Sequence, residues 1–342
     1  MSTSLPTAQP GRAPGTSARD PEAVLRRLEL TVTRRLDGLL HGDHLGLVPG
    51  HGTEPAESRE YRAGEDDVRR MDWAVTARTT VPHVRDLVAD HELETTVIVD
   101  ATASMDFGTA ELEKRDLALS AVAAIGFLTQ RTGNRLGAVV AHERGVRRLP
   151  ALAGREPLLR VLRLLATAPR STADVEGATD TGAQLAHALD AAGRQARRRG
   201  LVVVVSDFLD GDPTTGEVPW AGGLRRLAVR HDVLAVEVSD PREHELPDVG
   251  LLSLVDPETG RRREVWTGSR KLRERYAAAA AEQRAARAEV LRRTGAHHVA
   301  LRTDRDWVRD LARSVLTRNR TASLAGAGGP AGAGLARTGG AR

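Results

Sequence analysis

The sequence predicts an α/β fold built on a doubly wound, mostly parallel sheet. Short, almost continuously apolar runs recur along the chain, as in strands that are buried on both faces of a sheet. Segments with apolar residues at helical spacing lie between these runs, and this alternation is typical of parallel sheets covered by helices. The chain has 342 residues, which is enough for one large domain of this class with additional segments.

The chain is predicted to divide into four parts. Residues 1–19 are rich in Ser, Thr, Pro and Gly, and residues 319–342 are rich in Gly and Ala, so both tails are predicted to be disordered. Residues 20–92 are predicted to hold an N-terminal helix, with Asp20 as its N-cap, and then an irregular, densely charged segment. Residues 93–318 are assigned to the α/β domain.

Five apolar runs are the predicted strands of the sheet: Glu94–Asp100, Leu136–Ala141, Leu201–Ser206, Val233–Val238 and His297–Leu301. Apolar residues at helical spacing predict helices around residues 117–128, 158–165, 185–189 and 271–294. The last of these helices is preceded by two short segments, 251–256 and 262–266, which are separated by a Pro/Gly turn and are expected to form a hairpin.

Composition narrows the possible functions. The formal net charge is +4, and all but two of the 50 basic residues, Lys114 and Lys271, are arginines. These arginines are interleaved with Asp and Glu, so we interpret them as solvated faces and expect no nucleic-acid partner. The absence of cysteine excludes disulfides, thiolate metal sites and a cysteine nucleophile, and it fits the cytoplasm, where we expect the protein. No apolar segment reaches the roughly 20 residues of a membrane span, and none is expected.

Oxygen-bearing side chains gather in three loops that precede helices or follow predicted strands. Asp100, Thr102 and Ser104 alternate in one tight loop, Thr179 lies before the helix around residues 185–189, and Asp207 follows the strand 201–206. Ligands of open α/β sheets bind outside the carboxyl ends of the strands. Carboxylates and hydroxyls suit Mg²⁺ or Mn²⁺. Capping is the alternative interpretation: of the following helix by Thr181 more than by Thr179, and of a loop by Asp207.

This set of five residues resembles the metal-ion-dependent adhesion site (MIDAS) of von Willebrand factor A-type domains, whose pattern is D-x-S-x-S followed by a distant Thr and a distant Asp. The resemblance implies a Rossmann-like von Willebrand factor A domain that binds Mg²⁺ (or Mn²⁺). Thr102 stands where that pattern has its first Ser, which keeps a hydroxyl group. A degenerate site that no longer binds metal is a further possibility.

A second motif lies upstream, between residues 59 and 73. It resembles the signature of the bacterial domain-of-unknown-function 58 family, roughly R-x-Y-x-x-G-D-D-x-R-x-I-D-W, with Glu65 where that family usually has Asp. We interpret the dense charges of this segment as an ion-pair network beside the metal loop, or else as a docking surface. The matching residues are Arg59, Tyr61, Arg62, Gly64, Asp66, Asp67, Arg69, Asp72 and Trp73.

The sequence therefore favours a binding module over an enzyme. An adhesion-type ion can accept a carboxylate from a partner protein, whereas hydrolysis needs a positioned base or nucleophile, for which we find no motif. Asp106 and Asp210 are the best remaining candidates for such a base or for a group that supports the metal ligands, and loop capping is the simpler interpretation of both. The family resemblance implies a MoxR-type AAA+ ATPase as partner and an adaptor or chaperone-like role. The alternative is a metal-dependent phosphoesterase or nuclease that uses the same aspartates.

Overall fold

The computed structural model describes residues 55–61, 68, 71–87, 93–110, 112–129, 133–168, 183–216, 218–255, 262–315 and 317. The predicted N-terminal helix, both predicted tails and Thr179 lie outside the described residues. Within these residues no helix is both long and apolar enough to cross a membrane.

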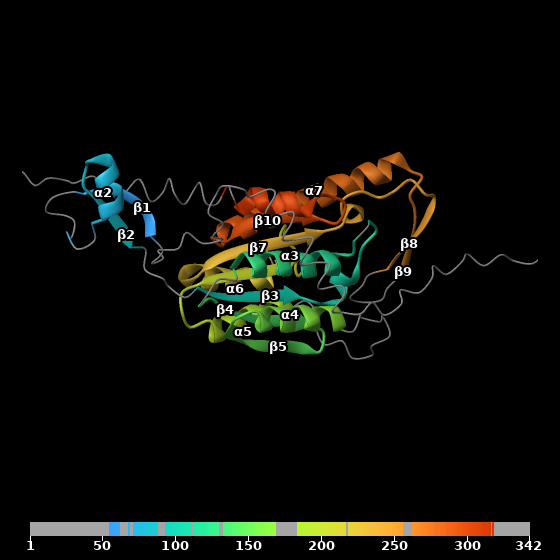
Figure 1. Cartoon of the computed structure of the whole chain (residues 1–342). Helices are drawn as coiled ribbons and strands as arrows, with labels where there is room; N and C mark the ends of the chain where they lie inside the picture. The colour runs from blue at the N-terminus through green and yellow to red at the C-terminus, as the bar shows by residue number, and fades with distance from the viewer. Residues whose placement is uncertain are drawn as a thin grey trace, which may run out of the picture.

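Six strands form the central sheet, in the order β10-β7-β6-β3-β4-β5 (Figure 1). Every neighbouring pair is parallel except β4 and β5, which pair antiparallel at one edge. This arrangement confirms the predicted α/β class with a doubly wound, mostly parallel sheet. The strands are β3 (Glu94–Asp100), β4 (Arg135–His142), β5 (Gly145–Ala153), β6 (Leu201–Ser206), β7 (Asp232–Ser239) and β10 (His297–Arg302).

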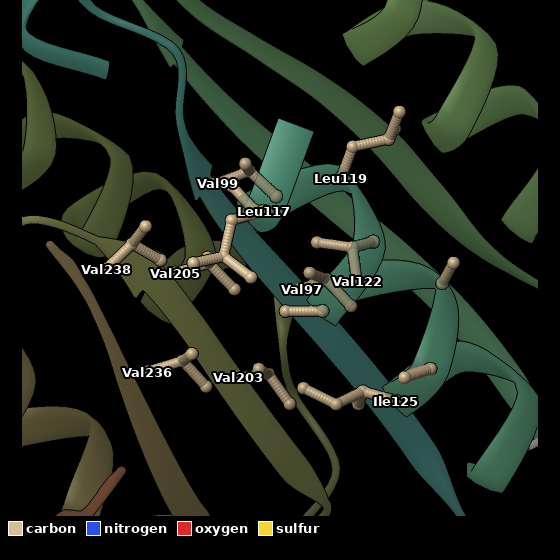
Figure 2. Close-up of a cluster of buried hydrophobic side chains, with 14 of the residues drawn as sticks. Val97, Val99, Leu117, Leu119, Val122, Ile125, Val203, Val205, Val236 and Val238 are labelled. Atoms are coloured by element: carbon tan, nitrogen blue, oxygen red, sulfur yellow. The ribbon is translucent and has the colours of Figure 1, made fainter. Parts of the chain in front are cut away.

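Helices cover both faces of this sheet because successive side chains of a strand point to opposite faces. Val97 and Val99 of β3 pack in one core with α3 (Lys114–Thr129), α4 (Glu156–Thr167) and the helical residues 307–315. Figure 2 shows the part of this core around β3 and α3. Ile98, between them, packs in the other core. That second core contains residues of α5 (Gln184–Gln195), α6 (Pro219–Arg230) and the end of α7 (Arg270–Arg293).

The sequence-based prediction lacks one strand and two α-helical segments of this domain. β5 is an edge strand with a mostly exposed or half-buried surface, so it has no continuous apolar run. α6 contains two adjacent glycines, but Trp220, Leu224 and Leu227 give it a buried stripe at helical spacing. The third element is the helical segment 307–315, whose Trp307, Val308 and Leu311 are buried.

The segment before residue 93 is more regular than predicted. β1 (Pro55–Glu60) and β2 (His83–Leu87) pair antiparallel, and α2 (Trp73–Thr79) lies between them in sequence. Asp72 caps α2, because its carboxylate accepts hydrogen bonds from the amides of Ala74 (3.1 Å) and Val75 (3.2 Å). Figure 1 shows this unit outside the layers of the main sheet, at the end opposite β8 and β9. Its position beside the metal loop, or its role as a docking surface, stays a prediction.

The predicted hairpin is present. β8 (Leu251–Val255) pairs antiparallel with β9 (Arg262–Trp266), and α7 follows directly. The hairpin and the first turns of α7 project beyond the central sheet (Figure 1).

Gly200, immediately before β6, gives a test of how closely the strands approach. A Cβ atom at this position would lie 2.1 Å from the carbonyl oxygen of Glu94. This clash could be relieved only by a shift of the backbone at Gly200 or at Glu94. Gly200→Ala is therefore expected to lower the free energy of unfolding by about 1–3 kcal/mol, the usual cost of overpacking. Urea unfolding followed by circular dichroism measures this difference.

Gly193→Ala in α5 is the matched control. Its Cβ would lie 3.8 Å from Leu227, an ordinary contact, and alanine favours a helix by roughly 0.5–1 kcal/mol over glycine. Equal midpoints for the two variants would contradict the close approach at Gly200.

Candidate metal-binding site

Two neighbouring strands bring the predicted metal loops together. β3 and β6 are parallel and adjacent, with Val99 opposite Val205, so the loops that follow them leave the same edge of the sheet. Asp100 ends β3 and Asp207 follows β6 directly, and both side chains are buried. The prediction that these two loops meet is thus confirmed by the topology of the sheet.

The loop after β3 is folded around the carboxylate of Asp100. Its Oδ1 accepts hydrogen bonds from the amide (3.0 Å) and the hydroxyl (2.6 Å) of Thr102. Its Oδ2 accepts a hydrogen bond from the hydroxyl of Ser206, at 2.7 Å. The short 3-10 helix η2 (Ala103–Asp106) begins immediately afterwards, with Thr102 at its N-cap and Ser104 buried within it. Asp100 therefore fixes the position of Thr102, whose hydroxyl lies within hydrogen-bond distance of Ser104.

The loop after β6 makes a sharp turn that aims Asp207 at the site. Phe208 has a φ angle of +53°, which is uncommon for a residue other than glycine. Its ring packs edge-on against that of Trp220, with the ring centroids 5.1 Å apart. The turn lets the amide of Leu209 donate to Oδ1 of Asp207, at 3.2 Å. Burial of Phe208 against Trp220 thus holds a strained backbone that orients a site residue.

The donor set fits a hard divalent cation. The hydroxyl oxygens of Thr102 and Ser104 lie 3.3 Å apart, close to the spacing of about 3 Å between neighbouring oxygens around Mg²⁺. Thr102 donates its proton to Asp100 and Ser104 hydrogen-bonds Asp207, which leaves oxygen lone pairs on both hydroxyls. Within the described residues no group of three or more His, Asp or Glu could hold a metal ion.

The two aspartates have opposite electrostatic environments. Burial raises the pKa of Asp100, and the neighbouring charge of Asp207 raises it further. Burial also acts to raise the pKa of Asp207, but the ammonium of Lys114 and hydrogen bonds from Lys114, Ser104 and Leu209 outweigh it and hold the pKa below its ordinary value. The buried ammonium of Lys114 therefore already balances the charge of Asp207, one of the predicted metal ligands.

Lys114 is the main functional residue that sequence reasoning missed. It is the first residue of α3, its side chain is only 1% exposed, and its Nζ lies 2.8 Å from Oδ2 of Asp207. The same ammonium donates a hydrogen bond to Glu243, the last residue of the 3-10 helix η4 (Pro241–Glu243) after β7. The signal available in the sequence was rarity, because lysine occurs at only two positions.

Asp240, also missed, ties the neighbouring loops together. It is fully buried and accepts hydrogen bonds from the amide (2.8 Å) and hydroxyl (2.6 Å) of Thr109, the amide of Arg242 (2.9 Å) and the hydroxyl of Thr303 (2.8 Å). In return its own amide donates to Glu243 at 3.0 Å, which completes a capping box. Asp240 thereby orients the carboxylate that meets Lys114.

Of the two candidate bases, Asp106 has a charged partner. Asp106 forms an ion pair with Arg115, whose Nε lies 2.6 Å from Oδ1 of the carboxylate, and both side chains are largely buried. Asp210 is half-buried three residues after Asp207. The geometry of Asp106 therefore fits a structural pair that holds η2 against α3.

Apolar side chains are exposed around this edge of the domain. Phe107 and Leu209, each next to a metal loop, are 38% and 39% exposed. In the β8–β9 hairpin, which follows η4 along the chain, Leu251 and Trp266 are 60% and 64% exposed. Leu251 and Trp266 are paired across the hairpin, and contiguous exposed apolar groups are typical of protein-binding surfaces.

The signature residues are only partly described. Arg59 lies in β1, the amide of Tyr61 donates to the carbonyl of Pro82 at 2.8 Å, Asp72 caps α2, and Trp73 is 69% exposed. The other predicted signature residues, Arg62, Gly64, Asp66, Asp67 and Arg69, lie outside the described residues. The role of this segment in interaction stays a prediction.

Comparisons with known proteins place the sequence among uncharacterized proteins. It matches the family described as "Protein of unknown function DUF58" over residues 57–286. It is 54% identical over 304 residues to uncharacterized proteins of Mycobacterium bovis and Mycobacterium tuberculosis, covering 89% of this chain and 91% of each relative. A Mycobacterium avium protein, also uncharacterized, is 46% identical over 179 residues, covering 52% of this chain and 98% of that protein.

Solved structures similar to this chain include von Willebrand factor A domains. The conserved hypothetical protein BatB from Bacteroides thetaiotaomicron aligns with a TM-score of 0.39 and 11% identity, covering 67% of this chain and 99% of that chain. The SpRpn10 VWA domain aligns with a TM-score of 0.36 and 12% identity (65% and 94% covered). A von Willebrand factor type A structure from Catenulispora acidiphila aligns with a TM-score of 0.35 and 14% identity, covering 66% of this chain and 43% of that chain.

Proposed function

The chain belongs to the DUF58 family of proteins of unknown function, and on that premise we propose that it is a Mg²⁺-dependent protein-interaction module. The observation that carries the proposal is the pair of buried hydroxyls, Thr102 and Ser104, held 3.3 Å apart by the two aspartates of adjacent strand ends. The exposed apolar side chains around the same edge support a protein as the ligand.

Two pairs of residues would have different roles in holding an ion. Thr102 and Ser104 would bind it through their hydroxyl oxygens, while Asp100 and Asp207 accept hydrogen bonds from these hydroxyls and orient them. Thr179, the fifth predicted ligand, lies outside the described residues. With so few carboxylates on the ion itself, bound Mg²⁺ or Mn²⁺ would supply an electrophilic position for an acidic side chain of a partner protein.

The partner that we propose is a MoxR-type AAA+ ATPase, with this chain acting as its adaptor or as a chaperone-like subunit. The support for this partner is the family resemblance of the signature segment and the metal loop. An ATPase partner would present an Asp or Glu carboxylate to the ion and apolar residues to Phe107 and Leu209 on its rim.

A metal-dependent phosphoesterase is the alternative that uses the same aspartates. Hydrolysis would need a carboxylate or another base that is available to activate water. Asp106 is paired with Arg115, Asp207 with Lys114, and Asp240 accepts four hydrogen bonds. These contacts favour binding over hydrolysis among the described residues.

Calorimetric titration with MgCl₂ and capture of the MoxR-type ATPase of the same organism test the proposal together. The wild-type chain is expected to bind one Mg²⁺ and to retain the ATPase in Mg²⁺ but not in EDTA. Thr102→Val and Ser104→Ala each remove one hydroxyl at little change in volume, and each is expected to weaken Mg²⁺ binding by about tenfold or more. Both variants should lose the Mg²⁺-dependent capture.

Thr214→Val is the matched control, because Thr214 is exposed and bonds only Asp212 in its own turn. It should bind Mg²⁺ and the ATPase as the wild type does. A wild-type chain that binds no Mg²⁺ with or without the ATPase would refute the metal role. Capture that survives in EDTA would refute the metal-bridged contact, and Mn²⁺-dependent turnover of a model phosphoester that is lost in Asp100→Ala would favour the alternative.

A further inference from the structure

Lys114 occupies a position that its helix does not explain. It is the first residue of α3, where the positive end of the helix dipole disfavours a cation. Its backbone amide donates to the carbonyl of Phe107 at 2.9 Å, so the start of the helix is fixed against the site loop. The side chain is 1% exposed, and its ammonium meets two carboxylates, those of Asp207 and Glu243. These carboxylates are what stabilises a buried lysine here.

The charges around Lys114 leave the site acidic. Among the carboxylates at this edge, those of Asp207 and Glu243 are bonded to Lys114, and the third carboxylate that concerns the site, that of Asp100, lies beside Asp207. Two of the three are almost completely buried, and buried charges are costly unless they are paired. Lys114 therefore already performs at Asp207 the neutralisation that a bound metal would perform.

The same ammonium must repel a metal ion. Ser104 hydrogen-bonds Asp207, and Lys114 holds Oδ2 of that carboxylate at 2.8 Å. Any divalent cation held by the hydroxyl of Ser104 thus shares a carboxylate with a second positive charge. Like charges placed so close cost binding free energy, most of all where water is excluded.

We propose that Lys114 is the resident counter-cation of the site, which keeps the metal loops assembled without metal and lowers their affinity for divalent cations. This inference rests on the proposed function. It adds a regulatory property, because the ion is left short of negative charge that an acidic side chain of the partner supplies. Metal and partner are then expected to bind cooperatively.

Lys114→Met tests this inference, since methionine fills the buried space of the lysine stem without its charge. By calorimetry the variant is expected to bind Mg²⁺ at least about tenfold more tightly than the wild type. In EDTA it should melt at a lower temperature than the wild type, because Asp207 and Glu243 lose their cation, and Mg²⁺ should raise its melting temperature by more than that of the wild type.

The chain offers a matched control in Lys271→Met, which removes its second lysine from an exposed position in α7. This variant should keep the wild-type affinity for Mg²⁺. Glu243→Gln is a second test in case Lys114→Met does not fold. It leaves Lys114 on Asp207 and removes one acid, so Mg²⁺ affinity should fall several-fold.

The outcomes separate this inference from the proposed function. If the wild type binds Mg²⁺ but Lys114→Met binds it no more tightly, or if Glu243→Gln has unchanged affinity, the counter-cation role is refuted while the metal site stands. If neither the wild type nor Lys114→Met binds Mg²⁺, the metal role itself is refuted.

Discussion

Replacing Arg287 by methionine is expected to lower the free energy of unfolding by about 3–5 kcal/mol, as for other buried charges that lose a partner. Glu237 lies in β7 with its side chain 3% exposed, and Nη1 of Arg287 in α7 contacts its Oε1 at 2.8 Å. His298 contacts Oε2 at 2.8 Å. Without Arg287 the buried carboxylate keeps only the histidine. Urea unfolding at neutral pH measures the loss.

Burial acts to raise the pKa of Glu237, but the hydrogen bond from His298 and the charge of Arg287 outweigh it and hold the pKa below its ordinary value. A carboxyl whose pKa is lowered by folding stabilises the protein above its unfolded pKa, and this contribution is lost as the pH falls through the folded pKa. The difference between wild type and Arg287→Met should therefore shrink in acid.

Arg284→Met, an exposed change in the same helix, controls for the loss of an arginine. It should alter stability by less than about 0.5 kcal/mol. The double variant Glu237→Met/Arg287→Met removes both charges and should recover most of the loss. Equal effects of the two arginine variants would show that the buried pair does not stabilise the fold.

Asp240→Ala is expected to be the other severely destabilising change, at about 3 kcal/mol or more. It removes four hydrogen bonds to a buried carboxylate and leaves the hydroxyls of Thr109 and Thr303 without their acceptor. Since Asp240 also orients Glu243, the variant should loosen the contact between Glu243 and Lys114. Thermal and urea unfolding check the stability.

Asp248→Ala provides the comparison, because Asp248 is 61% exposed and makes a surface ion pair with Arg273. Its effect should be within about 1 kcal/mol. Burial acts to raise the pKa of Asp240, but the hydrogen bonds from Thr109, Arg242 and Thr303 outweigh it and lower the pKa. Wild type and Asp240→Ala should thus converge as the pH falls through this lowered pKa, and a constant difference in acid would contradict the assignment.

The fold was predictable where burial alone shapes the sequence. All five predicted strands are present because a strand covered on both faces must be apolar at nearly every position. β5 was not predicted because it lies at an edge of the sheet and its residues are exposed or half-buried. In the segment before residue 93, β1, β2 and α2 escaped because short elements on a small surface leave no periodic apolar pattern.

The candidate site was predictable where it is local. Asp100, Thr102 and Ser104 lie within five residues, and hydrogen bonds inside that loop arrange them. Asp207 could be added because parallel strands end at the same edge of a sheet. Lys114 and Glu243 could not be predicted as part of the site. Lys114 lies 93 positions before its partner Asp207, and Glu243 lies 129 positions after its partner Lys114.

The sequence by itself determined the class of the fold, the family and the loop in which hydroxyl and carboxylate side chains alternate. These features depend on apolar runs and short motifs, which are properties of neighbouring residues. Only the tertiary structure decided which charges meet. A lysine can be buried here because carboxylates from two distant loops converge on it, and the stability of such a group depends on its partners in space and not on its neighbours in the chain.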